Sequence, residues 1–198
     1  MKNLRYLAKG KRGVVYTTTY RNKKVAIKKK NPDSEAIGRI QHEANMLKLL
    51  NKANIGPKFI SHKENELIYV FVEGEFIIDF IEKNSKTNIL KVLNDIFKQM
   101  FTLDKLGLNK EEMHHPLKHI LVHKNKPVMI DFERTHYTIK PKNVTQFCQF
   151  MMSTKKLLDS KNIKINKKEI MSLAQTYKNK RTLENFNNIL RLLNNKSI

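Results

Sequence analysis

The sequence has no tryptophan and contains one cysteine, six glycines and five prolines among 198 residues. The single cysteine, Cys148, excludes an internal disulfide and any zinc site built from several cysteines, and it is typical of a reducing compartment. The longest apolar run, 67–72, is far too short to cross a bilayer, and no apolar stretch follows the first five residues. We therefore expect a cytoplasmic chain with no secretion signal and no membrane partner.

Acidic residues are also few. There are 18 Asp and Glu against 39 Lys and Arg, so the formal net charge is +21 and the isoelectric point is near 10.0. Such a field attracts polyanions, including RNA, a ribonucleoprotein, nucleotides or an acidic protein. Because the lysines are spread along the whole chain, a compositional bias with solvated lysines on every face explains the charge equally well. Both interpretations stay open.

The hydrophobic fraction, 40%, is enough for a core in one domain or in two small lobes around a cleft. Apolar periodicity changes near residue 84, from short strands plus one helix to mostly helices, which predicts an α+β fold. The expected strands are 5–8, 14–20, 24–29, 58–62, 66–72, 120–122 and 128–130. The expected helices are 34–50, capped by Asp33 or Ser34, then 88–106, 143–158, 167–178 and 182–194, the last capped by Thr182.

A turn with two glycines joins the first two expected strands. Gly10 and Gly13 lie three residues apart, and glycines in such a turn let backbone amides approach phosphate oxygens. An ordinary hairpin also uses two glycines in this way.

The strand 25–28 places Ala26 and Lys28 on one face, because side chains alternate across a strand. A small residue beside a lysine makes room for a flat ring and supplies a positive charge for phosphates; the alternative is a solvated lysine in a run of three. Glu43 interrupts the apolar stripe of the next helix, which includes Ala36, Ile40, Leu47 and Leu50. If Glu43 is buried it needs a partner, and Lys28 is the candidate. If it lies at the rim of the stripe, it is solvated.

Together these segments resemble the small lobe of the eukaryotic-like protein kinase superfamily. The glycine-rich loop of that family matches Ala8, Gly10, Gly13 and Val15, the lysine strand matches 25–28, and the helix glutamate matches Glu43. The resemblance implies a two-lobed kinase-like fold, with a small lobe at 1–72, a hinge region at 73–83 and a reduced helical large lobe at 84–198. Residues 68–74 look like the last small-lobe strand and the hinge.

The segment 128–133 resembles the Asp-Phe-Gly segment of kinases, which implies that Asp131 holds Mg²⁺. Glu133 stands where the family has glycine. This change removes backbone freedom and favours a fixed conformation.

The catalytic loop departs most from the family pattern. Counting back from the strand 120–122 puts His119 at the position of the family's asparagine, His114 at that of the catalytic aspartate and Glu112 at that of the histidine. A histidine accepts a proton near neutral pH, so His114 is the candidate base, with Glu112 or Glu111 as substitutes. His119 is a poor ligand for Mg²⁺, which prefers oxygen.

Three histidines at a spacing of four, His115, His119 and His123, also invite a zinc interpretation. Pro116 and the strand 120–122 argue against one helix through all three.

Only 67 residues follow Asp131, and no Ala-Pro-Glu signature follows it; 140–147 takes its place. The reduced length resembles the compact archaeal kinases, namely RIO kinases, the kinase of the KEOPS complex and the predicted archaeal serine/threonine protein kinases. The resemblance implies an ATP- and Mg²⁺-dependent serine/threonine protein kinase with a protein acceptor. The residues implied to bind ATP are Leu7, Gly10, Gly13, Val15, Ala26, Lys28, Glu43, Val70, Phe71, Glu73 and Leu121. Those implied to bind metal are Asp131 and His119, and those implied in catalysis are Lys28, Glu112 and His114.

Two other hypotheses remain. A kinase-fold protein without transfer activity would bind ATP or RNA as a scaffold in a ribonucleoprotein complex, and the altered catalytic loop favours it. A small-molecule kinase of the aminoglycoside or choline type is the third, although such kinases usually keep the loop aspartate and need a larger acceptor-binding lobe.

Overall fold

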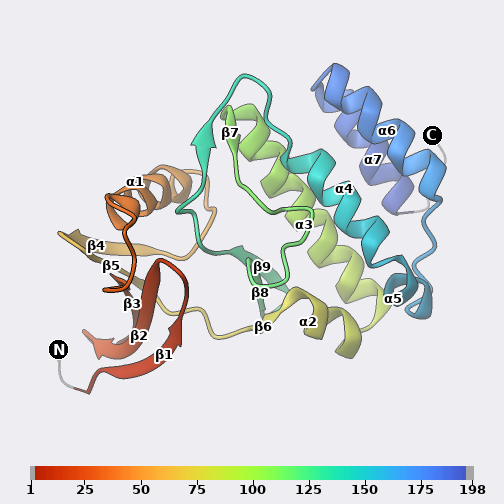
Figure 1. Cartoon of the computed structure of the whole chain (residues 1–198). Coiled ribbons are helices and arrows are strands. Elements are labelled where there is room, and N and C mark those ends of the chain that lie inside the picture. Colours follow the sequence, from red (N-terminus) through yellow and green to blue (C-terminus); the bar gives the residue numbers. More distant parts are fainter. Residues whose placement is uncertain (1–2, 195–198) are drawn as a thin grey trace. The chain divides into compact units, whose positions relative to one another are not determined.

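The structure is a computed structural model that describes residues 3–194 (Figure 1). Within that range the chain has a five-stranded antiparallel sheet and seven helices. This confirms the α+β fold class that the sequence predicted. It divides into two compact units. Unit 1 contains the chain up to Glu73 together with Val128–Thr135, and unit 2 contains Gly74–Pro127 and the chain from His136 onward.

The sheet of unit 1 is antiparallel throughout and has the order β1-β2-β3-β5-β4. Its strands are β1 (Arg5–Lys9), β2 (Gly13–Tyr20), β3 (Lys23–Lys30), β4 (Phe59–Lys63) and β5 (Glu66–Val70). All five predicted strands are confirmed, although β5 ends at Val70 and not at Val72. The β2–β3 turn consists of Arg21 and Asn22, both with positive φ, so adjacent strands pair with almost no connecting chain.

The helix of unit 1, α1 (Arg39–Asn51), begins five residues later than predicted, and the expected cap at Asp33 or Ser34 is wrong. The Ser34 hydroxyl accepts a hydrogen bond from the Ala36 amide, only two residues on, which makes a local turn and not a helix start. Ala36 therefore lies outside the helical stripe. The helix starts after Gly38, whose φ of 70° lies in the left-handed region that glycine adopts without strain.

Helix α1 packs against β3, β4 and β5 and buries its apolar stripe on one face of the sheet (Figure 1). Gly56, with φ of 84°, completes this core from the loop after the helix. A Cβ atom there would lie 2.8 Å from both the Leu47 and Phe132 side chains. Phe132 is thus part of the core of unit 1, although it is separated from Leu47 by 85 positions in the sequence.

Unit 2 is mainly helical. Its helices are α2 (Ile77–Lys83), α3 (Lys86–Lys105), α4 (Asn143–Ser153), α5 (Lys155–Ser160), α6 (Lys167–Asn179) and α7 (Leu183–Leu193). Its short strands are β6 (Glu75–Phe76), β7 (Leu108–Asn109), β8 (Ile120–His123) and β10 (His136–Tyr137), and β9 (Lys126–Met129) leads out of it. The sheets of these strands have the orders β6-β8-β9 and β10-β7. The sequence did not predict α2, β6, β7 or β10.

The amphipathic helix predicted at 88–106 is confirmed as α3, and Thr182 caps α7 by accepting from the Asn185 amide. The single helix predicted at 143–158 is wrong, because the chain breaks into α4 and α5 at Thr154. The hydroxyls of Ser153 and Thr154 both donate to the Phe150 carbonyl, and this competes with the continuing helical ladder. Among residues 3–194, no helix combines the length and apolar character needed to span a membrane.

A buried polar network joins α3, α4 and α6 within unit 2. Asn143 is the first residue of α4, lies buried after the cap residue Lys142, and donates to Asp104 Oδ1 at 2.6 Å. Tyr177 donates its hydroxyl to Asp104 Oδ2 at 2.9 Å. Burial raises the pKa of Asp104, whereas these donors lower it. Cys148 is a buried core residue, and burial raises the pKa of its thiol to about 12, so it is an unreactive thiol at neutral pH.

Candidate functional site

Lys28 is the centre of the candidate site. Its side chain leaves β3 on the face covered by α1, and the residue is only 7% exposed. Its ammonium group lies 2.6 Å from Glu43 Oε2, 3.0 Å from Asp131 Oδ1 and 3.3 Å from Glu133 Oε2. The predicted ion pair between Lys28 and Glu43 is confirmed. Glu43 is 4% exposed, so the alternative of a solvated glutamate at the rim of the stripe is wrong.

Gly13 allows the Lys28 side chain to take this path. The two residues are on neighbouring strands, and a Cβ atom at Gly13 would lie 2.8 Å from Lys28 Cε. The Lys28 side chain would have to move to make room, but its ammonium group is held by three carboxylates. Space for Lys28 is therefore a reason for glycine at this position that the sequence analysis did not consider.

The glycine-containing turn is held down by Asn31, a buried residue at the end of β3. The Asn31 side-chain amide donates to the carbonyl oxygens of Gly10 and Lys11, each at 3.2 Å, and its backbone amide donates to the Arg12 carbonyl at 2.9 Å. The Gly10 amide donates to the Gly13 carbonyl at 2.8 Å. The turn is therefore a pinned hairpin, whose fixed backbone directs the Arg12 side chain.

That side chain reaches the same cluster. Arg12 Nη1 lies 3.0 Å from Glu133 Oε1, while the other oxygen of this carboxylate faces Lys28. Two cations thus share one carboxylate, which is the arrangement in which a phosphate group would also be held.

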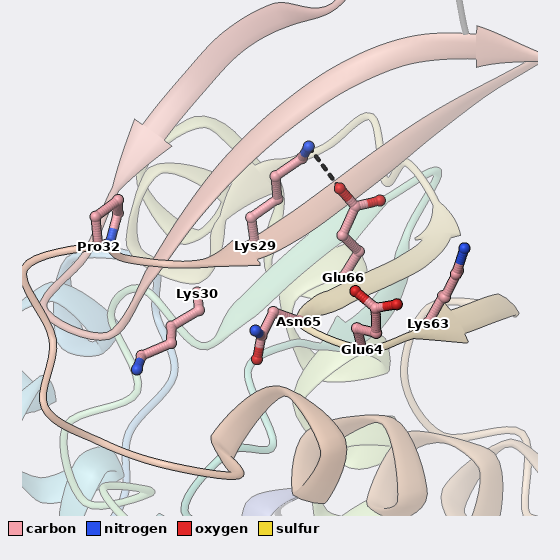
Figure 2. Close-up of a pocket in the computed structure, with 7 residues that line it drawn as sticks. All are labelled: Lys29, Lys30, Pro32, Lys63, Glu64, Asn65 and Glu66. Atoms are coloured by element: carbon pink, nitrogen blue, oxygen red, sulfur yellow. Dashed lines mark ion pairs between the residues drawn. The ribbon is translucent and has the colours of Figure 1, made fainter.

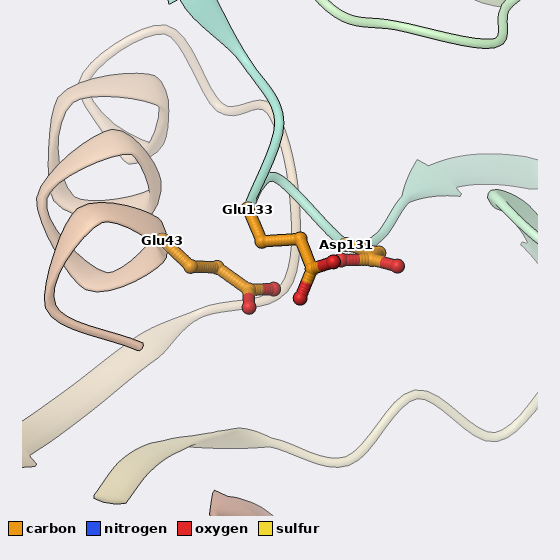
Figure 3. Close-up of side chains that lie close together, drawn as sticks. All are labelled: Glu43, Asp131 and Glu133. Carbon is orange, nitrogen blue, oxygen red and sulfur yellow. The ribbon is translucent and has the colours of Figure 1, made fainter. Parts of the chain in front are cut away.

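The three carboxylates of Glu43, Asp131 and Glu133 converge, with one oxygen atom of each within 4.8 Å of the others (Figure 3). Oxygen ligands of this kind suit Mg²⁺ or another hard cation. Asp131 has a φ of 62°, a costly conformation for a residue other than glycine. The next amide, that of Phe132, donates to Glu43 Oε1 at 3.3 Å.

The 131–135 segment runs along α1, and two further α1 side chains bind it. His42 Nε2 lies 2.6 Å from the Thr135 carbonyl, and Arg39 Nη1 donates to the Glu133 carbonyl at 3.5 Å. The contacts on the C-terminal side of Asp131 therefore stabilise its left-handed backbone conformation.

Three acids around Lys28 shift the pKa values of both partners of the buried pair. Burial lowers the pKa of Lys28, but the Coulombic attraction of Glu43, Asp131 and Glu133 outweighs burial and raises the pKa above 10.5. Burial also raises the pKa of Glu43, where the attraction of Lys28 is opposed by the charges of Asp131 and Glu133. Counting Arg12, the cluster holds three carboxylates and two cations, so its local charge favours one more cation.

The residues predicted to surround adenine have varied environments. By strand register Val15 lies opposite Lys28 in the sheet, and Ala26, on the same face of β3, is buried. Leu7 is 48% exposed, and Val70 is half-buried in β5. Leu121 belongs to β8 of unit 2.

The predicted hinge residues are partly engaged within unit 1. The Phe71 amide donates to the Lys24 carbonyl at 3.0 Å as an extension of the sheet, and Glu73 pairs with Lys24 at 3.1 Å. Lys24 Nζ also lies 4.3 Å from the centre of the Phe71 ring. A ligand that used the Phe71 amide would have to replace an existing hydrogen bond.

The residues of the predicted catalytic loop lie in unit 2. His119 Nε2 is 3.0 Å from Glu112 Oε2, and Glu112 has a φ of 70°, a second strained acidic residue. His114 is exposed, and Glu111 accepts from the Asn109 side chain at 3.0 Å. In the described chain the ligand atoms of His115, His119 and His123 do not gather into a metal-binding group.

Sequence reasoning did not find three contributors to the Lys28 cluster and its turn. Glu133 was recognised only as a replaced glycine, and neither Arg12 nor Asn31 was assigned a role. The pairing of Glu133 with two cations depends on tertiary structure. The signal that the sequence did offer was an acid two residues after Asp131, in a chain poor in acids.

No protein-family model matches the sequence. The chain is 30% identical over 113 residues to "Uncharacterized protein MJ1211" of Methanocaldococcus jannaschii; the match covers 54% of this chain and 97% of that protein. The chain belongs to the same family as this archaeal protein.

Replacing Lys28 tests how strongly the cluster depends on its central cation. In Lys28→Met, three carboxylates remain without their ammonium group, and we expect a loss of about 3–5 kcal/mol in the free energy of unfolding at pH 7. The loss should shrink as the pH falls and the acids become protonated. Urea denaturation at several pH values measures this.

Lys29→Met is the matched control, because Lys29 pairs with Glu66 at 2.6 Å but both side chains are more than a third exposed. It should lose at most about 1 kcal/mol. Because the attraction of three acids raises the pKa of Lys28, its contribution in the wild-type protein persists up to pH 10.5 and declines as the pH rises through the shifted value. At low pH the contribution falls as the three carboxylates become protonated. Equal losses in both variants would contradict the central role of Lys28.

Proposed function

We propose that the chain is an ATP-dependent phosphotransferase with a two-lobed kinase-like fold, acting on serine or threonine in a protein acceptor. The observation that carries the proposal is the buried contact of Lys28 with Glu43 and Asp131. A strand lysine, a helix glutamate and an aspartate that follows a strand are the three groups that the kinase resemblance predicts together. They come from segments separated by 15 and 88 positions and meet within 3.0 Å of one ammonium group.

In this proposal unit 1 is the small lobe together with the Asp131 segment, and unit 2 is the reduced helical lobe. Lys28 binds the phosphates of ATP, and Glu43 keeps its ammonium group in place. Asp131 and Glu133 offer the oxygen ligands for Mg²⁺, which when bound neutralises phosphate charge. Glu43 is already engaged with Lys28 and the Phe132 amide, so it serves mainly to position the other groups.

Glu133 gives the site a feature of its own. Its carboxylate is held by Lys28 and Arg12, which are the cations that an incoming phosphate would contact first. ATP therefore competes with an internal anion, and the displaced Glu133 carboxylate would be available to hold Mg²⁺ when the metal is bound.

The proton acceptor is assigned to His114 or Glu112 on the count along the loop. Glu112 is held against His119, so a carboxylate–imidazole pair is available to accept a hydroxyl proton. His114 is exposed to solvent, so an acceptor hydroxyl could reach it directly.

One alternative has a specific observation in its favour. A kinase-fold scaffold that binds ATP or RNA without transferring phosphate fits a loop that has histidine at the aspartate position, together with a Phe71 amide already used by the sheet. A measurement of phosphate transfer distinguishes the two functions, whereas a measurement of nucleotide binding does not.

Phosphoryl transfer is the first test. With labelled ATP and Mg²⁺, we expect the wild-type protein to phosphorylate itself or a generic basic protein, and Lys28→Ala or Asp131→Asn to lower the rate by at least about 10²-fold, because each removes a charge that stabilises the transferred phosphate. Lys29→Ala is the control and should keep its rate. Binding of Mg-ATP without any transfer by the wild-type protein would favour the scaffold.

Removing the internal anion should strengthen nucleotide binding. We expect Glu133→Gln to bind ATP about tenfold more tightly in the absence of Mg²⁺, since one negative charge near the phosphates is lost. The gain should be smaller with Mg²⁺, for which Glu133 is a ligand. Isothermal titration calorimetry measures both, with Glu66→Gln as a control for loss of a surface acid; an unchanged affinity in Glu133→Gln would rule out competition.

Two substitutions decide which residue is the base. Whichever of Glu112→Gln and His114→Ala removes the base should slow transfer about 10²- to 10⁴-fold while leaving ATP binding intact. If neither substitution changes the rate, the loop assignment is wrong.

A further inference from the structure

The sheet of unit 1 has a second face, turned away from α1. Lys28 and the residues opposite it in neighbouring strands point toward α1, so the alternate residues point to the other side. On that side Tyr16 pairs with Tyr6 of β1 and with Ile27 of β3, and Tyr20 pairs with Lys23.

We call this surface the tyrosine face. It comprises Tyr6, Tyr16 and Tyr20 together with the cations Lys9, Arg21, Lys23, Lys29 and Lys63.

The tyrosines do not form a closed core. Tyr6 is 64% exposed, and its ring meets that of Tyr16 edge to face with 6.2 Å between centroids. The apolar centre of the face, formed by Val25, Ile27 and Ile68, is already covered by Tyr20 and Ile60. Tyr6 therefore presents most of its ring to solvent, while Tyr16 and Tyr20 are half-buried beside it.

Cations border these rings. Arg21 lies 5.2 Å above the centre of the Tyr20 ring, and Lys9 lies opposite Val14, two residues before Tyr16 on the neighbouring strand. Lys9 is paired with Asp33, and Lys29 with Glu66. In the part of the chain that the structure describes, Lys23 and Lys63 form no ion pair, so their charge remains available.

Two cations of the tyrosine face, Lys29 and Lys63, also line an open pocket of about 490 Å³ beside the β4–β5 turn (Figure 2). It is lined by Lys29, Lys30 and Lys63 on the basic side and by Glu64 and Glu66 on the acidic side. Figure 2 shows Lys29 reaching Glu66 while the Lys63 ammonium points away from the pair.

We infer that the tyrosine face binds single-stranded nucleic acid. The exposed Tyr6 ring and the accessible parts of the Tyr16 and Tyr20 rings can stack on bases irrespective of sequence, and the surrounding lysines and arginine bind the backbone phosphates. Stacking needs unpaired bases, which a duplex does not offer. Tyr16 and Tyr20 are four residues apart on one strand, roughly 13 Å, so the ligand must extend over several nucleotides. The net charge of +21 adds long-range attraction for a polyanion.

This inference is independent of phosphoryl transfer, because it uses the opposite face of the sheet from Lys28. It also assigns a role to five of the 39 Lys and Arg residues, those that lie on the tyrosine face.

The test uses the full chain and a fluorescently labelled 12-nucleotide oligouridine RNA, with binding measured by anisotropy at several salt concentrations. We expect Tyr6→Ala to bind about tenfold more weakly, the loss expected for one stacked base, and Tyr6→Phe to retain binding because it keeps the ring. Tyr137→Ala is the matched control, since Tyr137 is 65% exposed and lies in unit 2. It should bind like the wild-type protein.

The charge contribution is tested with Lys63→Ala. It should lower the slope of log affinity against log salt by about 0.7, corresponding to one lost phosphate contact on a single strand, whereas Lys178→Ala should leave the slope unchanged. The inference is overturned if Tyr6→Ala, shown by circular dichroism to be folded, binds like the wild-type protein. It is also overturned if Tyr137→Ala loses as much, or if a 12-base-pair duplex competes as well as the single strand. An equal affinity for oligothymidine DNA would support the stacking mechanism and assign no preference for RNA.

Discussion

Unit 1 is organised around one ammonium group. Lys28 is buried and contacts three carboxylates, of which Asp131 is about a third exposed. Glu43 comes from α1, and Asp131 and Glu133 come from the segment that follows β9. A buried charge must be paired, so the positions of these segments are not independent of one another. Arg12 extends the same requirement to the β1–β2 turn through Glu133.

The cluster contains more acid than a single lysine neutralises. Burial raises the pKa of Glu43, and the charges of Asp131 and Glu133 add to that rise, while the attraction of the three acids outweighs burial and raises the pKa of Lys28. The excess of acid distinguishes the site from a purely structural ion pair, whose charges would balance. A polar centre that is short of positive charge is suited to bind a cation together with an anionic substrate, and this is the electrostatic basis of the proposed function.

The sequence predicted the sheet, most of the helices and the Lys28–Glu43 contact, because these follow from alternation, from the 3.6-residue period and from the need to pair a buried acid. It failed where local polar groups override periodicity: the Ser34 hydroxyl delays α1, and the hydroxyls after Phe150 divide one predicted helix in two. Glu133 and Asn31 could not be assigned, since their partners lie 105 and about 20 positions away and no spacing rule connects them.

Unit 1 is discontinuous in the chain, and this has a consequence for its synthesis. When residues up to Glu73 have left the ribosome, Glu43 is the only one of the three acids available to Lys28. The site beside Leu47 and Gly56 that Phe132 fills in the folded protein is then still empty. The sheet and α1 must therefore remain an unfinished intermediate until some sixty further residues have been made. An expression fragment cut at the apparent boundary would expose an apolar hole and lack two of the three acids, so the smallest piece able to fold as unit 1 extends through Thr135.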